Sequence, residues 1–317
     1  MGSLDLPDQP DKPMREMQVG AGGADQNTHE PREPPDPDER GRAYQATLKH
    51  VSAETPTEAS PGQRPDAGDQ RSYWDEVPRF HKMWAEHKKD WQEQRAAEPD
   101  RSSDPPGTYY SKGGLKLNPE RHAETKEAIR TMRDAEPPIS ADMQRVGQEN
   151  TSGGWLEGFD HRFKGDDRLK EKIASQVAAE PDKPSSLILR KIPDALRYTC
   201  CFEPDNYTKG YHDIKARLEK LGHEMYQSIN YWADPEYKGI NSRWVTQRGQ
   251  RFEVQFHTPE SFHTKEHVTH KAYERLRNTQ ISSEERGKLE GFQREVSSHI
   301  RVPDSAADIP DFKKEGF

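Results

Sequence analysis

Acidic and basic side chains in the second half of the chain fall into three short clusters whose residue types suit phosphate chemistry. The first, "HRFKGDDRLKEKI", places Arg162, Lys164 and Arg168 just before or inside the first turn of an expected helix. Cations are disfavoured at a helix N-terminus, where anions are preferred, so three of them make sense there if they face a bound polyanion. A solvated helix face is the alternative, and this cluster alone does not decide between the two.

The second cluster is Asp194 with Arg197, in "KIPDALRYTCCF", at the start of an expected central strand. A carboxylate beside a buried apolar run needs a partner, because an unpaired charge there is costly. Two interpretations follow. Asp194 is either one half of a structural Asp–Arg pair or a carboxylate that binds a metal ion.

The third cluster is a hairpin, "YKGINSRWVTQRGQRFEVQFHT", which turns at Gly249. Strand side chains alternate between the two faces, so the second strand separates polar from apolar residues. One face carries Arg251, Glu253, Gln255 and His257, and the other carries Phe252, Val254 and Phe256. The polar face is either an ordinary exposed surface or part of a site.

The three clusters together match one chemical requirement. Phosphoryl transfer from a nucleotide needs Mg²⁺ held by one or two carboxylates, with cations neutralising the remaining phosphate charge. Asp194 and Glu253, expected on neighbouring strands, suit the metal, and the basic cluster suits the phosphates. The sequence therefore predicts a nucleotide site on the polar face of the hairpin.

The elements that position these residues are predicted from apolar periodicity. Helices are expected over 118–134, 166–180, 211–222, 264–278 and 282–300, and strands over 187–192, 195–203, 225–232 and the hairpin. We therefore expect an α+β domain whose mixed sheet has about four or five strands, flanked by helices. Its range is 111–303, followed by a polar tail over 304–317.

Residues 1–110 have a different composition. Of the 25 prolines in the chain, 14 lie in the first 106 residues, and long stretches lack apolar periodicity. We expect a mostly disordered arm there, because too little apolar surface is present to offset the entropy of ordering. One amphipathic helix is expected near 78–96, from the spacing of Phe80, Trp84 and Trp91. It either docks on the domain or binds a partner, such as a neutralising or carrier protein.

Composition excludes some classes of function. The formal net charge is −8, so no overall basic field draws the chain to nucleic acid or anionic lipid. No run of 18 apolar residues occurs, so we expect no association with a membrane. We expect the protein to act in the cytoplasm, either of the cell that produces it or of a target cell. The only cysteines, the adjacent Cys200 and Cys201, are expected to be buried thiols. His263 and His267 have a spacing that suits zinc, but no further ligands complete such a set.

The ordered series "HRFK…DDRL…EKI", "DALRY", "YKGINS" and "FEVQFHT" resembles the synthetase domain of RelA/SpoT-type alarmone enzymes, over about residues 155–277. "DALRYT", "FEVQFHTPESFH" and "YERLRNTQISSEER" resemble, more narrowly, a branch found in polymorphic bacterial toxins and phage head proteins. The resemblance implies a nucleotidyltransferase-like fold. It also implies pyrophosphokinase activity, in which ATP donates its β,γ-pyrophosphate to the 3′-hydroxyl of a nucleotide.

The resemblance also implies roles for single residues. Asp194 and Glu253 would be the catalytic residues and bind Mg²⁺, with Glu253 also able to accept the hydroxyl proton. The ATP phosphates would be bound by Arg162, Lys164, Arg168 and Arg197. The acceptor nucleotide would be bound by Lys238, Ile240, Asn241, Ser242, Gln255, His257 and His263.

Two positions depart from the family pattern. The tyrosine that stacks on an acceptor guanine is Ile240 here, and a histidine further along is Trp244. An adenine nucleotide is therefore expected as acceptor in preference to a guanine nucleotide. Two alternatives remain open: an enzyme of the same fold that modifies an RNA 3′ end, with tRNA as a partner, and an inactive nucleotide- or RNA-binding module.

Overall fold

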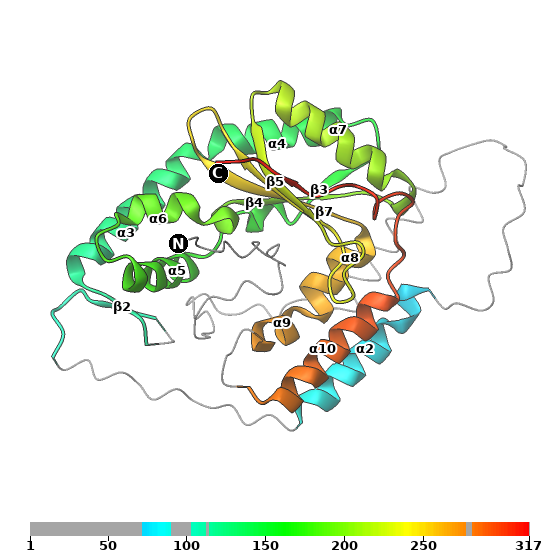
Figure 1. Cartoon of the computed structure of the whole chain (residues 1–317), viewed down its shortest axis with the longest axis horizontal. Helices are drawn as coiled ribbons and strands as arrows, with labels where there is room; N and C mark the ends of the chain where they lie inside the picture. The colour runs from blue at the N-terminus through cyan, green and yellow to red at the C-terminus, as the bar shows by residue number, and fades with distance from the viewer. Residues whose placement is uncertain (1–71, 90–102, 112–113, 277–280, 317) are drawn as a thin grey trace, which may run out of the picture.

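The computed structural model describes residues 72–89, 103–111, 114–276 and 281–316 (Figure 1). Its helices and strands follow one another from a helix at residue 73 to a short strand at residue 313. In chain order they are α2 (Tyr73–Lys88), β1 (Tyr109–Tyr110), β2 (Lys116–Leu117), α3 (Pro119–Ala135), α4 (Pro137–Glu149), β3 (Trp155–Glu157), η1 (Phe159–His161), α5 (Asp166–Ala179), α6 (Ser185–Lys191), η2 (Pro193–Ala195), β4 (Arg197–Cys201), η3 (Pro204–Asn206), α7 (Tyr207–Lys220), β5 (Glu224–Asn230), β6 (Ile240–Val245), β7 (Arg251–His257), α8 (Pro259–His263), η4 (Thr264–Val268), α9 (His270–Leu276), α10 (Ser283–Ser298) and β8 (Phe312–Lys313).

A mixed sheet of six strands in the order β3-β4-β7-β6-β5-β8 forms the centre of the described residues. β4 and β7 are parallel, whereas the other neighbouring strands are antiparallel. The expected α+β fold, a mixed sheet flanked by helices, is confirmed, and the sheet is one strand larger than the upper expectation.

The two faces of the sheet differ in chemistry. The face that carries Phe252, Val254 and Phe256 packs against α4 and α7 in the main hydrophobic core (Figure 1). Tyr211 of α7, for example, meets Phe256 edge to face with ring centroids 4.9 Å apart. Alternation along β7 then turns Glu253 and Gln255 to the opposite face. The apolar face thus fixes which residues the polar face presents.

Helix α2 is part of the domain. It begins at Tyr73, five residues before the expected start, and the part of the prediction that covers Trp91 lies outside the described residues. Its apolar stripe of Tyr73, Val77, Phe80 and Trp84 is buried in the main core, and Trp84 packs on Phe292 of α10 with ring centroids 5.5 Å apart. Of the two interpretations of this helix, docking on the domain is the one observed. Residues 1–71 lie outside the described residues, so the disorder expected there stays a prediction.

The C-terminal residues are also part of the fold, so the expectation of a polar tail over 304–317 is wrong for its described residues. Ala306 and Ile309 are buried in the main core, and β8 pairs with β5 at the edge of the sheet. The Asn230 side chain holds this segment by donating hydrogen bonds to the carbonyls of Ala306 and Ile309, both at 2.7 Å. The sequence predicts a tail here because two buried side chains and side chain–backbone hydrogen bonds leave no periodic pattern of apolar residues.

The run "LILRKI", expected as a strand, is the helix α6. Ile188 and Leu189 are buried in a second cluster with α3 and α5 residues, whereas Leu187 is exposed. A short apolar run does not distinguish a strand from a buried helix by periodicity, and packing against two helices decided this one. No described helix combines the length and the apolar content needed to cross a membrane.

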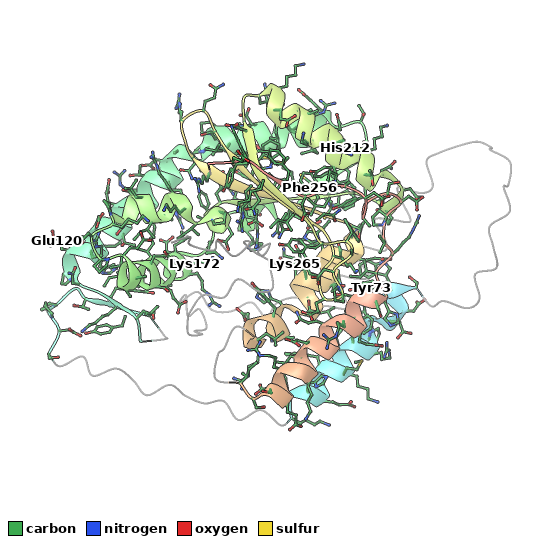
Figure 2. The ribbon with its side chains drawn as sticks, viewed as in Figure 1. Tyr73, Glu120, Lys172, His212, Phe256 and Lys265 are labelled. Carbon is green, nitrogen blue, oxygen red and sulfur yellow. The ribbon has the colours of Figure 1, made fainter. Side chains whose placement is uncertain are left out.

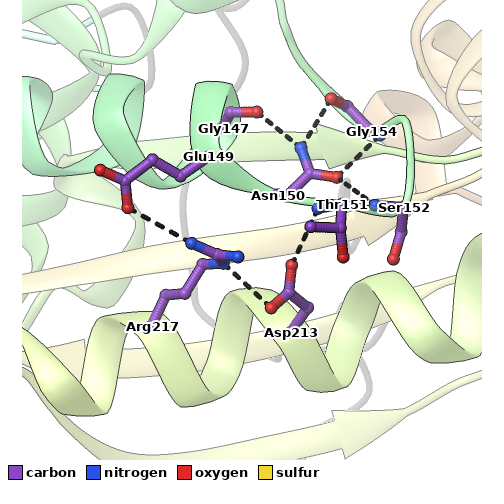
Figure 3. Close-up of polar contacts among 8 residues, drawn as sticks. All are labelled: Gly147, Glu149, Asn150, Thr151, Ser152, Gly154, Asp213 and Arg217. Atoms are coloured by element: carbon purple, nitrogen blue, oxygen red, sulfur yellow. Dashed lines mark hydrogen bonds and ion pairs between the residues drawn. The ribbon is translucent and has the colours of Figure 1, made fainter.

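The turn from α4 into β3 is organised by one side chain (Figure 3). Asn150 donates to the carbonyls of Gly147 and Gly154 at 2.6 and 2.9 Å, and its own oxygen accepts from the Ser152 and Gly154 amides at 3.1 and 3.0 Å. The Thr151 amide donates to Asp213 of α7 at 3.2 Å. These bonds fix the edge strand β3 and the segment that follows it, which carries the first basic cluster.

Candidate active site

Charged side chains cross the polar face of the sheet in one row. Directly paired strand residues point to the same face, about 4.8 Å apart from strand to strand. Arg197 of β4 pairs with Glu253 of β7, Glu253 with Arg243 of β6, Arg243 with Gln227 of β5, and Gln227 with Lys313 of β8. We call this row the charged rung. Its five residues come from positions 197 to 313, and register alone aligns them.

Glu253 is the one carboxylate of the charged rung. Its side chain is buried and accepts a hydrogen bond from the Gln255 amide. Burial raises the pKa of Glu253, and Asp194 raises it further, while Arg197 and Arg243 on the flanking strands pull it back. A carboxyl with a raised pKa in a site is suited to accept a proton from a substrate.

Asp194 has the opposite electrostatic environment. Lys164 lies 2.8 Å from Asp194 Oδ2, and Lys172 donates to Oδ1 and Oδ2 at 2.9 and 3.2 Å. Burial alone would raise the pKa of Asp194, but the two lysines outweigh it and the pKa is lowered. The same burial lowers the pKa of Lys164. Asp194 is therefore an ionised carboxylate held between two ammonium groups.

Backbone pairing explains how the first basic cluster reaches Asp194. The Lys164 amide donates to the Ala195 carbonyl at 3.1 Å, and the Arg197 amide donates to the Arg162 carbonyl at 2.7 Å. These bonds align residues 162–164 with 195–197, so Lys164 and Asp194 become neighbours. Lys172 follows on α5, and Figure 2 labels it. Lys172 is not among the site residues expected from the sequence, although it directly precedes Ile173, which is buried on the inner face of that helix.

Lys265 and Glu266 were also missed. They lie in η4, a π-helical turn in which the Thr269 amide donates to the Thr264 carbonyl at 2.8 Å. Glu266 accepts from Lys265 and lies 4.0 Å from the Arg197 guanidinium. Burial raises the pKa of Glu266, but the charges of Lys265 and Arg197 outweigh burial and lower the pKa to about 2. The sequence predicts one continuous helix over 264–278 and does not indicate this turn. π-turns are frequent at functional sites.

Two residues of the expected phosphate set have other partners. Arg168 forms an ion pair with Glu274 of α9 at 2.7 Å, which links α5 to α9. Arg162 donates to the buried Glu136 at 2.8 Å and stacks over Phe159. Glu136 in turn accepts from Tyr198, whose side chain lies on the core face. The structure thus brings together Lys164, Arg197 and Asp194, and places Arg162 apart from them.

The expected acceptor residues divide by face. Gln255 pairs with Asn241 on the row next to the charged rung, and the Gln255 Oε1 atom is buried without a hydrogen-bond partner among the described residues. His257 is fully buried between the Tyr237 hydroxyl, 3.1 Å away, and the Ser261 hydroxyl, 2.9 Å away. Burial lowers the pKa of His257 well below the ordinary value, so the ring is neutral. Gln255 and Asn241 therefore lie on the same face of the sheet as Glu253. His257 connects Tyr237 and Ser261 in the buried layer beside them.

Lys238 has two backbone partners. Its ammonium group donates to the carbonyls of Trp232 and Asp234 at 2.9 and 2.7 Å. Burial lowers the pKa of Lys238. These two hydrogen bonds tie the Lys238 side chain to the backbone of the loop between β5 and β6, so Lys238 stabilises the conformation of that loop.

Ile240, Ser242 and His263 do not face the site, contrary to expectation. Ile240 is fully buried in the main core, opposite Phe256. Ser242 donates to the Val254 carbonyl at 2.9 Å on that same face. Alternation along β6 decides this, because the partners of Glu253 and Gln255 are Arg243 and Asn241. His263 lies 2.9 Å from the Tyr73 hydroxyl of α2, and burial lowers its pKa to about 3.

The donor set of the site suits a magnesium ion. Mg²⁺ prefers oxygen ligands and is commonly held by one or two carboxylates together with substrate phosphates. Asp194 and Glu253 supply two carboxylates close enough for the charge of Asp194 to raise the pKa of Glu253, and Gln255 adds a buried oxygen without a partner among the described residues. Within those residues no group of three or more His, Cys, Asp or Glu side chains could hold a metal alone. The two carboxylates would therefore suit a magnesium ion whose remaining ligands come from substrate phosphates.

No protein-family model matches the chain, and no curated protein does. Among solved structures, the chain is similar to one solved as the complex between the type VI effector Tas1 and its immunity protein, with 22% identity, a TM-score of 0.39, and coverage of 56% of this chain and 96% of that one. The small alarmone synthetase 1 from Bacillus subtilis gives 12% identity and a TM-score of 0.38, with 55% of this chain and 90% of that one covered.

A GTP pyrophosphokinase family protein from Streptococcus pneumoniae gives 13% identity and a TM-score of 0.37, with 57% of this chain and 90% of that one covered.

Proposed function

We propose that the chain is a pyrophosphokinase that transfers the β,γ-pyrophosphate of ATP to the 3′-hydroxyl of a purine nucleotide. One observation carries the proposal. Asp194, in η2 just before β4, lies close enough to Glu253 of β7 for its charge to raise the pKa of Glu253, and the two carboxyls, whose pKa values are shifted in opposite directions, lie among the cations Lys164, Lys172 and Arg197. Phosphoryl transfer depends on positioning and charge stabilisation, and this set supplies both.

The proposed reaction forms one bond and breaks one. The acceptor oxygen bonds to the β-phosphorus, and the bond from that phosphorus to the oxygen bridging the α- and β-phosphates breaks, which releases AMP. Glu253 takes the hydroxyl proton, a role that its raised pKa favours. Gln255 lies beside it, and its Oε1, which has no hydrogen-bond partner in the part of the chain that the structure describes, can accept a hydrogen bond from the acceptor.

The cations bind the donor phosphates. In the structure Lys164 and Lys172 are engaged with Asp194, and a bound triphosphate would share them. Mg²⁺ held by Asp194 and Glu253 would neutralise charge that develops on the phosphate oxygens. Arg197, between Glu253 and Glu266, adds a charge that stays positive at any physiological pH.

The base of the acceptor is a separate matter. The expected contact between Ile240 and a base is wrong, because that side chain lies in the core. Adenine nucleotides remain our proposed acceptors, because the stacking tyrosine of the resembled motif is absent at this position. Tyr237, whose hydroxyl donates to Asn241 at 3.0 Å, is an aromatic side chain beside the acceptor residues.

The test is incubation of the full chain with Mg²⁺, γ-labelled ATP and a panel of AMP, ADP, GDP, GTP and tRNA. We expect label on a nucleotide together with one AMP per label transferred. ADP as the co-product would indicate an ordinary kinase, and label on tRNA would favour the RNA-modifying alternative. A labelled product on GDP alone would overturn the adenine preference and leave the transfer reaction standing.

A toxin role and a neutralising partner are further parts of the proposal, suggested by the sequence motifs. Helix α2 does not offer its apolar stripe to such a partner, because that stripe is buried against the domain. A partner would therefore bind elsewhere. Co-expression with a neighbouring open reading frame, read as rescue of growth, tests this part.

A further inference from the structure

Helix α2 meets the rest of the domain partly through histidine rings. Tyr73 and Trp74 pack against His263 of α8, with ring centroids 5.9 and 5.0 Å apart. Phe80 packs against His299, which follows α10, at 5.3 Å. Figure 2 labels Tyr73, at the first residue of α2. Histidine is the side chain whose charge ordinarily changes between pH 5 and 8, so this contact contains groups that acid can charge.

A chain of hydrogen bonds holds His263 as a neutral ring. The Thr264 hydroxyl donates to the Tyr73 oxygen at 2.8 Å, which directs the Tyr73 proton to His263 Nδ1, 2.9 Å away. Nδ1 is thus an acceptor, and the ring proton lies on Nε2. His263 is 6% exposed, and its Nε2 is buried without a hydrogen-bond partner among the described residues. A second proton would therefore charge a ring that has no acceptor for it.

The groups that face His263 do not compensate such a charge. Tyr73 and His81 face it from α2, and His267 faces it from η4 with ring centroids 5.1 Å apart. His81 Nε2 is also buried without a hydrogen-bond partner among the described residues. The carboxyl group of Glu260, on α8, acts on Tyr73 instead. Burial, with smaller contributions from His267 and His81, lowers the pKa of His263 to about 3.

Release of α2 would remove Tyr73 and Trp74 from the ring and expose His263 to water, where the pKa of histidine is about 6.5. A histidine whose pKa is lower in the docked state favours docking above the released value. This contribution falls as pH drops from about 6.5 towards about 3. We propose that His263 makes the docking of α2 an acid-sensitive switch, in which α2 is docked near neutral pH and released in mild acid.

The switch would act on a wall of the candidate active site. Thr264, which donates to Tyr73, is the first residue of η4, and Lys265 and Glu266 follow it. Glu266 lies 4.0 Å from the Arg197 guanidinium. Release of α2 removes the bond to Thr264 and with it a support of this turn, so we expect slower transfer in mild acid. That consequence rests on the proposed function, whereas the release of α2 does not.

Hydrogen–deuterium exchange of the full chain, read by mass spectrometry on peptides from α2, measures the docking equilibrium. Exchange times are scaled for the intrinsic pH dependence of amide exchange. One proton taken up on release adds about tenfold for each pH unit below 6.5, so the protection of α2 should fall about 25-fold from pH 7 to pH 5. Peptides from β7 should lose much less, because the contribution of Asp194 is lost only below about pH 4.

The variant His263→Asn isolates the titrating group. The asparagine oxygen can replace Nδ1 as the acceptor for Tyr73, and the side chain gains no charge in acid. We expect its α2 protection to change less than about threefold from pH 7 to pH 5. His212→Asn, at an exposed position on α7, is the matched control and should keep the wild-type pH dependence (Figure 2).

Wild-type protection of α2 that stays constant from pH 7 to pH 5 would overturn the inference, whatever the variants do. A loss of wild-type size in His263→Asn would overturn it too, because another group would then carry the proton. If His263→Asn does not dock at either pH, NMR titration of ring-labelled histidine in the wild-type chain decides. A His263 ring still neutral at pH 5 supports the switch, and one that titrates near pH 6.5 with α2 protected overturns it.

The exchange experiment and the labelled-ATP assay fail independently. Loss of α2 protection in mild acid, in a chain that transfers no label at any pH, would support the switch and reject the proposed function alone.

Discussion

At the scale of residues, the site contains two carboxyls with opposite protonation tendencies. Glu253 has its pKa raised, first by burial and then by Asp194, whereas Asp194 has its pKa lowered by two lysines. Neighbouring groups whose environments push their pKa values apart are typical of acid–base chemistry. Glu253 is thus suited to move a proton, and Asp194 to remain charged.

The first prediction concerns Glu253→Gln, which keeps the shape of the side chain and removes its charge. Loss of a positioned base and metal ligand should reduce pyrophosphate transfer at least about 10²–10⁴-fold. The measurement is transfer of label from ATP, with thermal unfolding as a check of the fold. Glu219→Gln, at an exposed position on α7, is the control. Near-wild-type turnover of Glu253→Gln would remove Glu253 from the mechanism.

The second prediction concerns the pH dependence of stability through Asp194. A carboxyl with a lowered folded pKa stabilises the fold above its unfolded pKa, about 3.9, and this contribution is lost as pH falls below that value. Asp194→Asn lacks the contribution at every pH and leaves two lysines facing each other. We expect it to unfold more easily at pH 7, by less than the about 3–5 kcal/mol that breaking a fully buried pair costs, because the Asp194 side chain is 20% exposed.

Urea unfolding at several pH values measures that difference. The gap between wild type and Asp194→Asn should shrink as pH falls below about 4. Asp308→Asn, at an exposed position, should show no such gap. A gap that stays constant with pH would mean that the lysines do not hold Asp194 in its charged form.

At the scale of elements, α2 supports the turn that carries Lys265 and Glu266. The Tyr73 hydroxyl accepts from Thr264 at 2.8 Å and lies 2.9 Å from His263 Nδ1. Thr264 is the first residue of η4, so the helix touches the turn that reaches Arg197. Arg79 also binds Glu295 of α10 at 2.8 Å. An N-terminal element thus stabilises a wall of the site.

The third prediction follows from this packing. Deletion of residues 1–89 should lower the melting temperature and the transfer rate, because it removes the buried Phe80 and Trp84. Phe80→Ala alone should cost about 3–5 kcal/mol. Deletion of residues 1–71 is the matched control, and the low apolar content of that stretch predicts little change. Equal melting temperatures for the two deletions would show that α2 contributes nothing to stability.

At the scale of the whole molecule, the polar face depends on a closing contact between the C-terminal segment and β5. β8 covers the edge of β5 and brings Lys313 to the charged rung. The Asn230 amide donates to Asp311 at 2.7 Å, in addition to the bonds from its side chain. Unpaired strand edges are templates for aggregation, so the segment also protects the sheet.

The fourth prediction is that a chain ending at residue 303 is less stable and associates at high concentration. It loses the buried Ala306 and Ile309 and exposes the β5 edge. Thermal unfolding and light scattering measure the two effects. Asn230→Ala, which removes only the side-chain bonds, should show a smaller loss of stability of about 1–3 kcal/mol. A truncated chain that melts and scatters as wild type does would contradict this role.

The sequence by itself determined the helices and strands with clear periodicity, and with them the alternation of β7. Phe252, Val254 and Phe256 had to be buried, so Glu253 and Gln255 had to point to the opposite face. Cys200 and Cys201 are buried free thiols for the same local reason, an apolar strand. Such conclusions need only neighbours along the chain.

Only the tertiary structure decided what each polar side chain meets. The register between strands from four parts of the chain put Arg243 and Lys313 in one row with Glu253, and it placed Ile240 in the core. Backbone pairing brought Lys164 to Asp194, while a buried glutamate, Glu136, engaged Arg162. A charge pairs with whatever the fold brings within a few ångströms, and sequence spacing does not encode that distance between separate elements.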